Sequence, residues 1–144
     1  MKWSQALNDF QHYLKIERGL SQNTVHSYRL DVQKLMRYFK THSITADPID
    51  IKVELIQQFL YELAKNANAR TQSRVISGLR SFFDYLVFEN YRKCNPLEQI
   101  EAPKIGRKLP DTLSVLEIDK IVAAIDLSKP LGDRNRAIIE TLYS

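Results

Sequence analysis

The sequence predicts an all-α protein, and three observations support that fold class. Apolar residues recur at helical spacing along most of the 144 residues, capping residues bound these stretches, and three prolines gather in one short segment between them. Four helical patterns precede the prolines and two follow them. We therefore expect a four-helix body, a linker and the first helices of a second body.

The first helical pattern begins at about Ser4 and ends near Gly19, a residue suited to the left-handed backbone at a helix C-terminus. Its apolar stripe consists of Leu7, Phe10 and Leu14. Ser21 is the expected N-cap of the second helix. Along that helix the apolar residues are Val25, Tyr28, Val32, Leu35, Met36 and Phe39, and the polar side is formed by Asn23, Ser27, Lys34 and Arg37.

The third predicted helix follows a turn at Asp47-Pro48 and is introduced by Asp50. Its inward-facing residues are Ile56, Phe59, Leu60 and Leu63.

The fourth predicted helix runs through residues 64–83, which contain no carboxylate but four basic residues: Lys65, Arg70, Arg74 and Arg80. Its apolar side is formed by Val75, Leu79, Phe82, Phe83 and Leu86, and its polar side by Arg70, Ser73, Arg74, Ser77 and Ser81. Gly78 lies among the polar residues. Glycine costs a helix about 1 kcal/mol relative to alanine, which either a close approach of a partner or a packing requirement explains.

The basic side of the fourth helix points to nucleic acid. Guanidinium groups and hydroxyls suit phosphates and the base edges of a major groove. A face that only solvates a helix usually mixes both signs of charge, and this one has no acid. Up to Ile100 there are 14 Lys and Arg against 10 Asp and Glu, and from Glu101 the numbers are 7 and 7, so the net charge of +4 arises in the first part. The alternative is a helical interaction module whose basic face binds an acidic protein partner.

The helical pattern breaks after Asn90, and prolines follow at 96, 103 and 110. Because a residue that precedes proline is disfavoured in a helix, residues 96–112 are predicted to form an extended linker. Ser114 and Glu117 then match a capping box that opens a helix, and a further helix is expected from Arg134 to Tyr143. Two helices are too few to close a core. The pattern still runs at the end of the chain, which favours a fragment over a naturally short DNA-binding protein.

Several function classes are excluded by composition. Cys94 is the only cysteine, so neither an internal disulfide nor a cysteine metal cage can form, and His12, His26 and His42 show no ligand spacing. No apolar run approaches the roughly 20 residues of a membrane span, and the N-terminus does not resemble a signal peptide. We expect a cytoplasmic protein that contacts no membrane.

The order of these pieces resembles the tyrosine recombinase (phage-integrase) family, and most closely its Xer-type members. The residues that carry the resemblance at the N-terminus are Tyr13-Leu14, Glu17-Arg18-Gly19-Leu20-Ser21, Asn23-Thr24, Tyr28 and Asp31. Further along they are Ser77-Gly78-Leu79-Arg80-Ser81-Phe82-Phe83, then Asn95-Pro96, Pro103-Lys104 and Leu109-Pro110, and finally Leu113-Ser114, Glu117-Ile118, Arg134-Asn135-Arg136-Ala137-Ile138-Ile139 and Leu142-Tyr143. The resemblance spans nearly the whole chain.

This resemblance implies three regions: a four-helix SAM-like core-binding domain over 1–95 that binds DNA, an interdomain linker over 96–112, and the truncated beginning of a catalytic domain over 113–144. The parent enzyme would cut one DNA strand with a tyrosine hydroxyl, form a 3′-phosphotyrosyl link and use no cofactor or metal. The family's catalytic residues would lie beyond Tyr143, which matches an apolar helix and is not the nucleophile. No catalytic residue is therefore assigned, and the chain alone should be inactive.

In this family the second and fourth helices of the core-binding domain lie in the major groove of duplex DNA, and the fourth is the basic helix found from charge. The predicted DNA-binding residues are Asn23, Thr24, Ser27, Arg70, Thr71, Ser73, Arg74, Ser77, Arg80, Lys104, Arg107 and Lys108. For Thr24 the alternative role is local capping beside Ser21. For the three linker residues the alternative is that they are solvated and contact no DNA. A homologous recombinase subunit is a further implied partner, in a tetramer of full-length chains.

Both an Xer protein that resolves chromosome dimers and a phage or transposon integrase fit these motifs. The start of the helical pattern at about Trp3, with no arm-binding domain before it, favours the Xer type.

Overall fold

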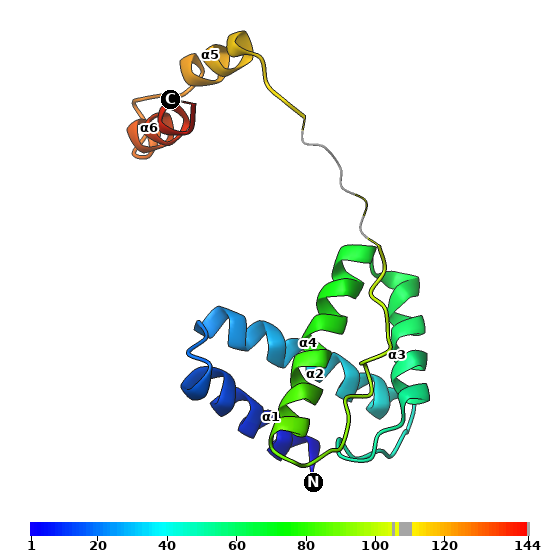
Figure 1. Ribbon diagram of the computed structural model, residues 1–144. Coiled ribbons are helices and arrows are strands. Elements are labelled where there is room, and N and C mark those ends of the chain that lie inside the picture. Colours follow the sequence, from blue (N-terminus) through cyan, green and yellow to red (C-terminus); the bar gives the residue numbers. More distant parts are fainter. Residues whose placement is uncertain (105, 107–110, 144) are drawn as a thin grey trace. The chain divides into compact units, whose positions relative to one another are not determined.

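A computed structural model describes residues 1–104, 106 and 111–143. It divides the chain into two compact units, residues 1–105 and 106–144, and each unit is considered by itself. The first contains α1 (Trp3–His12), the π-helix η1 (Tyr13–Glu17), α2 (Gln22–Thr41), α3 (Val53–Asn66) and α4 (Ala69–Phe88). The second contains α5 (Val115–Ala123) and α6 (Gly132–Tyr143) (Figure 1). The predicted all-α class is confirmed, because the described residues form helices and no strand.

The core of the first unit is assembled around α4, which packs against α2 and α3, and α2 makes the more extensive of these contacts (Figure 1). The predicted inward-facing residues of α1 and α4 are all buried. Aromatic rings hold the centre together: Phe82 lies 5.3 Å from Phe10 and 6.0 Å from Trp3, measured between ring centroids. Such pairs stabilise a core beyond the burial of their area.

The helix ends of the first unit follow the sequence signals in part. Gly19 has φ +60°, and the Ser21 hydroxyl accepts a hydrogen bond from the Thr24 amide, as the cap predictions require. Asp50 does not cap α3, whose N-cap is Lys52 without a side-chain hydrogen bond. The Asp50 amide instead closes a turn onto the carbonyl of Asp47. The first helix also changes to a π-helix from Tyr13, which its periodicity did not predict.

The packed body of the first unit continues past residue 95, where we expected the domain to end. Leu97 is fully buried in the core, and Ile100 packs on it. Arg80 of α4 holds this segment, because its Nη2 donates to the carbonyl of Ile100 at 2.8 Å. Just before the segment, Arg92 donates to the carbonyls of Pro48 at 2.9 Å and Ile51 at 3.0 Å and so fastens the turn after α4 to the loop before α3. The residues after Asn95 therefore begin as part of the helical body rather than as a free linker.

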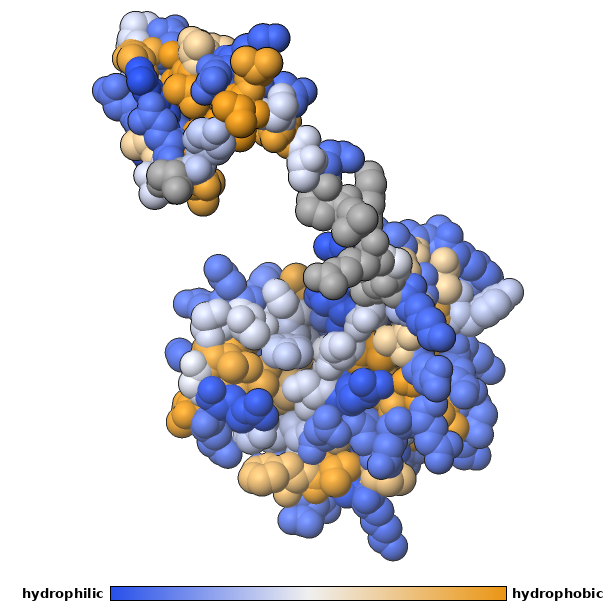
Figure 2. Space-filling view, turned by 45° about the horizontal axis from the view of Figure 1, so that its top comes forward, coloured by the Kyte–Doolittle hydropathy of each residue, from blue (hydrophilic) through white to orange (hydrophobic). Residues whose placement is uncertain are grey.

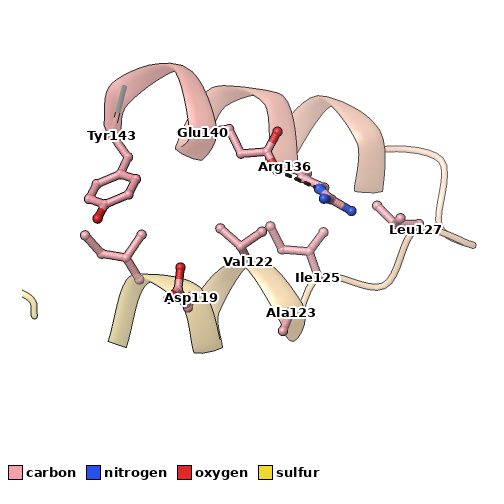
Figure 3. A pocket seen from close by; sticks show the side chains of 9 residues that line it. Asp119, Val122, Ala123, Ile125, Leu127, Arg136, Glu140 and Tyr143 are labelled. Atoms are coloured by element: carbon pink, nitrogen blue, oxygen red, sulfur yellow. Dashed lines mark hydrogen bonds and ion pairs between the residues drawn. The ribbon is translucent and has the colours of Figure 1, made fainter. Parts of the chain in front are cut away.

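The second unit consists of two helices that bury little. Ser114 forms the predicted capping box with Glu117. Among the described residues of this unit only Gly132 is buried, and Figure 2 shows large apolar areas between the hydrophilic ones. A groove between α5 and α6 is lined by Val122, Ile125 and other side chains, beside the Arg136–Glu140 ion pair (Figure 3). The expectation that two helices cannot close a core is confirmed.

None of the helices in the described part of the chain is long and apolar enough to cross a membrane.

Candidate nucleic-acid interface

The polar sides of α2 and α4 meet where these two helices pack together. On α2, Ser27, Asp31 and Lys34 are spaced by four and three residues and so lie on one side of the helix. On α4, Arg70 and Arg74 share a side in the same way. The Arg74 guanidinium Nη1 donates to Asp31 Oδ2 at 2.8 Å, so the two sides join in one surface.

Asp31 lies at the centre of this junction and is 2% exposed. Its Oδ2 accepts from Arg74, and its Oδ1 lies 3.5 Å from the Lys34 ammonium nitrogen. Among the described residues Oδ1 has no hydrogen-bond partner, so Lys34 contributes charge rather than a short bond. Burial raises the pKa of Asp31, while the charges of Arg74 and Lys34 act in the opposite direction.

Gly78 belongs to the packed side of α4, not to the exposed polar side predicted from the helical period. The residue is buried, and a Cβ atom there would lie 2.6 Å from Asp31 Oδ2 and 2.9 Å from Asp31 Cβ. The packing explanation of this glycine is therefore the correct one: its missing side chain makes room for the Asp31 carboxylate.

The predicted contacts at the start of α2 engage one another. The hydroxyls of Ser21 and Thr24 lie 2.9 Å apart, and the Thr24 amide is bound by Ser21. The local contact beside Ser21 that we considered as the alternative role of Thr24 is therefore present, and its DNA contact stays a prediction. Ser27 donates its hydroxyl to the carbonyl of Asn23 at 2.9 Å, and both residues are exposed.

The start of α4 presents a second set of the predicted residues. Asn68 is the N-cap and accepts a hydrogen bond from the Thr71 amide at 2.9 Å. Arg70 follows in the first turn with its side chain exposed, and Ser73 is half-buried. The N-terminus of a helix carries a partial positive charge, which adds to that of Arg70.

Arg80 and the linker residues stand apart from this junction. Arg80 Nη2 donates to the carbonyl of Ile100 at 2.8 Å, which holds the segment after Asn95 on α4. Lys104 is exposed, and Arg107 and Lys108 lie outside the described residues.

Two residues of this region were absent from the predicted contact set. Asp31 was noted only as part of a family motif, and an acid between basic residues is not a signal for DNA contact. Arg18 lines one surface groove together with Ser77, Arg80 and Ser81. Arg18 directly precedes Gly19 and is far from α4 in the sequence, so no local pattern predicted that it lies near residues of α4.

Comparison with known families finds the phage integrase N-terminal SAM-like domain over residues 7–90. Curated relatives include tyrosine recombinase XerD of Oceanobacillus iheyensis, 42% identical over 96% of this chain, and that of Lacticaseibacillus casei, 41% identical over 94%. These alignments cover 47% and 46% of the two relatives, so the chain spans about half of their length.

Among solved structures, the integrase from mycobacterium phage Brujita is similar, with a TM-score of 0.62 at 24% identity. The match covers 83% of this chain and 39% of the integrase. At that identity the likeness concerns the fold.

Proposed function

Since the chain belongs to the phage-integrase family of tyrosine recombinases, we propose that it is the part of such an enzyme that holds duplex DNA at a specific site. The observation that carries this proposal is the absence of any carboxylate from 64 to 83, a stretch that includes α4 as far as Phe83; Asp84 follows in the last turns of the helix. Arg70 and Arg74 lie on that side. Guanidinium groups at helical spacing reach both phosphates and guanine edges in a major groove.

The surface formed by α2 and α4 suits this role better than either helix alone. Arg74 and Lys34 both contact Asp31, so one carboxylate joins a basic group of α4 to a basic group of α2. Arg70 and the exposed Asn23 extend the polar surface to the start of each helix. Further members that we propose for this surface are other residues predicted from the sequence to contact DNA, including Thr71, Ser73, Ser77, Arg80 and Lys104.

With its DNA bound in this way, the parent protein would cut and rejoin the DNA through a phosphotyrosyl intermediate. Of the two processes that fit, we favour chromosome dimer resolution over DNA integration, because relatives named tyrosine recombinase XerD match over nearly the whole chain. Such an enzyme would act in the cytoplasm on duplex DNA, together with a homologous recombinase subunit.

The experiment is selection from random duplex DNA by the chain at about 50 and 200 mM salt, followed by sequencing of the bound fraction. We expect enrichment of one short motif and a steep loss of affinity with salt, since each neutralised phosphate contributes about 0.9 to the slope of log K against log salt. A failure to bind at either salt refutes the proposal and favours the module that binds an acidic protein.

A variant pair locates the interface. Arg74→Ala should weaken binding by about 1–3 kcal/mol if this arginine is bidentate to a guanine, and by less if it contacts only phosphate. Arg136→Ala is the matched control, because Arg136 is also about half exposed and paired with one carboxylate, but lies in the second unit. Equal affinities of the two variants would remove Arg74 from the interface.

A further inference from the structure

Asp31 is the only buried charged residue among those that the structure describes, and it lies within the proposed DNA-binding surface. A carboxylate repels phosphate, so this residue does not serve the interface by contact. Its position between the Arg74 guanidinium at 2.8 Å and the Lys34 ammonium at 3.5 Å suggests an indirect role.

The junction is built around this carboxylate. Gly78 leaves space in which any larger residue would place a Cβ atom 2.6 Å from Asp31 Oδ2. That space lets Asp31 lie between the helices while Oδ2 reaches Arg74, 43 residues along the chain. The carboxylate is therefore held by packing on one side and directs its oxygen at Arg74 on the other.

This contact fixes the orientation of the Arg74 guanidinium but occupies only one of its nitrogen atoms. The side chain is 49% exposed, and its one hydrogen bond within the described residues engages Nη1. A guanidinium carries five N–H donors, so most of them stay available to a ligand. An arginine already held in one orientation loses less conformational entropy on binding than a free one.

We infer that Asp31 is a positioning residue that orients Arg74 for the recognition of a base edge, the most suitable being the O6 and N7 acceptors of guanine. Without Asp31 the same arginine would remain as a mobile positive charge that attracts any phosphate. This inference rests on the proposed DNA-binding function and adds to it the origin of sequence discrimination.

The signature of such a role is that the substitution weakens binding to the selected site but not binding to random duplex DNA. Asp31→Asn removes a negative charge from the surface, so binding to random duplex DNA should stay unchanged or become tighter. Binding to the selected site should weaken about tenfold, because an unfixed arginine loses part of its discrimination. A residue that only supported the fold would weaken both kinds of binding together.

The test measures affinity for the selected site and for random duplex DNA with the wild-type chain and Asp31→Asn, after thermal melting has shown that both are folded. Glu54→Gln is the charge-matched control, since Glu54 is exposed in the first turn of α3. We expect the ratio of the two affinities to fall about tenfold in Asp31→Asn and to stay unchanged in Glu54→Gln. An unchanged ratio in Asp31→Asn overturns the inference.

A second comparison asks whether Asp31 acts through Arg74. In an Arg74→Ala background, Asp31→Asn should cause no further loss of discrimination, and an equal loss in both backgrounds overturns the inference. If the wild-type chain itself prefers no sequence, the proposed function fails first. If the wild type prefers one motif and Asp31→Asn does as well, only the positioning role fails.

Discussion

Replacement of Arg74 by alanine should destabilise the first unit through the carboxylate that it leaves behind. Asp31 is 2% exposed, and Arg74 supplies its 2.8 Å hydrogen bond. Removal of one partner from a fully buried ion pair costs about 3–5 kcal/mol, because the other charge stays buried without compensation. Here Arg74 is half exposed and Lys34 remains 3.5 Å from Oδ1. Solvent screening and the remaining cation reduce the expected loss to about 1–2 kcal/mol.

The reverse substitution should behave differently. Asp31→Asn removes the charge whose burial raises the pKa of this carboxyl, and the solvated Arg74 is not stranded by the change. We expect Asp31→Asn to change the free energy of unfolding by less than about 0.5 kcal/mol. Once Asn occupies position 31, Arg74→Ala should cost little, because no buried charge is left without a partner.

Urea denaturation of the wild type, both single variants and the double variant at neutral pH measures this coupling. The loss of unfolding free energy in the double variant should be smaller than the sum of the losses in the two single variants, by about 1 kcal/mol or more. If Arg74→Ala costs the same in the presence of Asp31 as in the presence of Asn, the buried carboxylate is not the cause and the reasoning is refuted.

The same carboxylate predicts a pH dependence. Its pKa in the folded chain is raised above the ordinary value of 3.8, so the folded state binds more protons in the interval between the two values. Stability contributed by this group therefore rises as the pH falls through that interval. Without Arg74 this pKa should rise further, so the cost of Arg74→Ala should shrink as the pH falls below that higher value, since a protonated Asp31 needs no cation. A cost that is constant with pH would contradict this account.

Three further outcomes follow from contacts elsewhere in the first unit. Arg92→Ala should lower the free energy of unfolding by about 1–3 kcal/mol, because two or more carbonyls lose a charged donor; an unchanged urea midpoint would count against it. Gly78→Ala should destabilise by about 1–3 kcal/mol despite its better helix propensity, since the new Cβ meets Asp31, and the loss should be smaller in Asp31→Ala. Burial raises the pKa of Tyr85 from 10.0 to about 12, so an ultraviolet titration should lose a step near that value in Tyr85→Phe, and the stability of the wild type should fall as the pH rises from about 10 to 12.

Much of the helical architecture could be predicted because it depends on local order. The apolar stripes of α1 and α4 follow the helical period, and the caps at Ser21 and Ser114 need only a hydroxyl at the right place in the chain. The family could be predicted from the order of several short motifs. The set of DNA-contacting residues stays a prediction throughout.

Other expectations failed where the outcome depends on partners distant in the sequence. Asp50 was expected to introduce the third helix, but it closes the predicted turn at Asp47-Pro48, and α3 begins only after Lys52. The segment after Asn95 looked like a linker because of its prolines, yet Leu97 enters the core and the carbonyl of Ile100 accepts a hydrogen bond from Arg80 of α4. Composition describes a segment by itself and cannot show which cavity it fills.

The sequence by itself therefore determined the helical class, the basic side of α4 and the family. Only the tertiary structure decided that Asp31 and Gly78, both on polar-looking stretches, are buried against one another beside Arg74. The physical reason is that burial at a helix crossing is a property of two helices at once. Asp31 and Arg74 are 43 residues apart, and no local pattern encodes the register in which α2 meets α4.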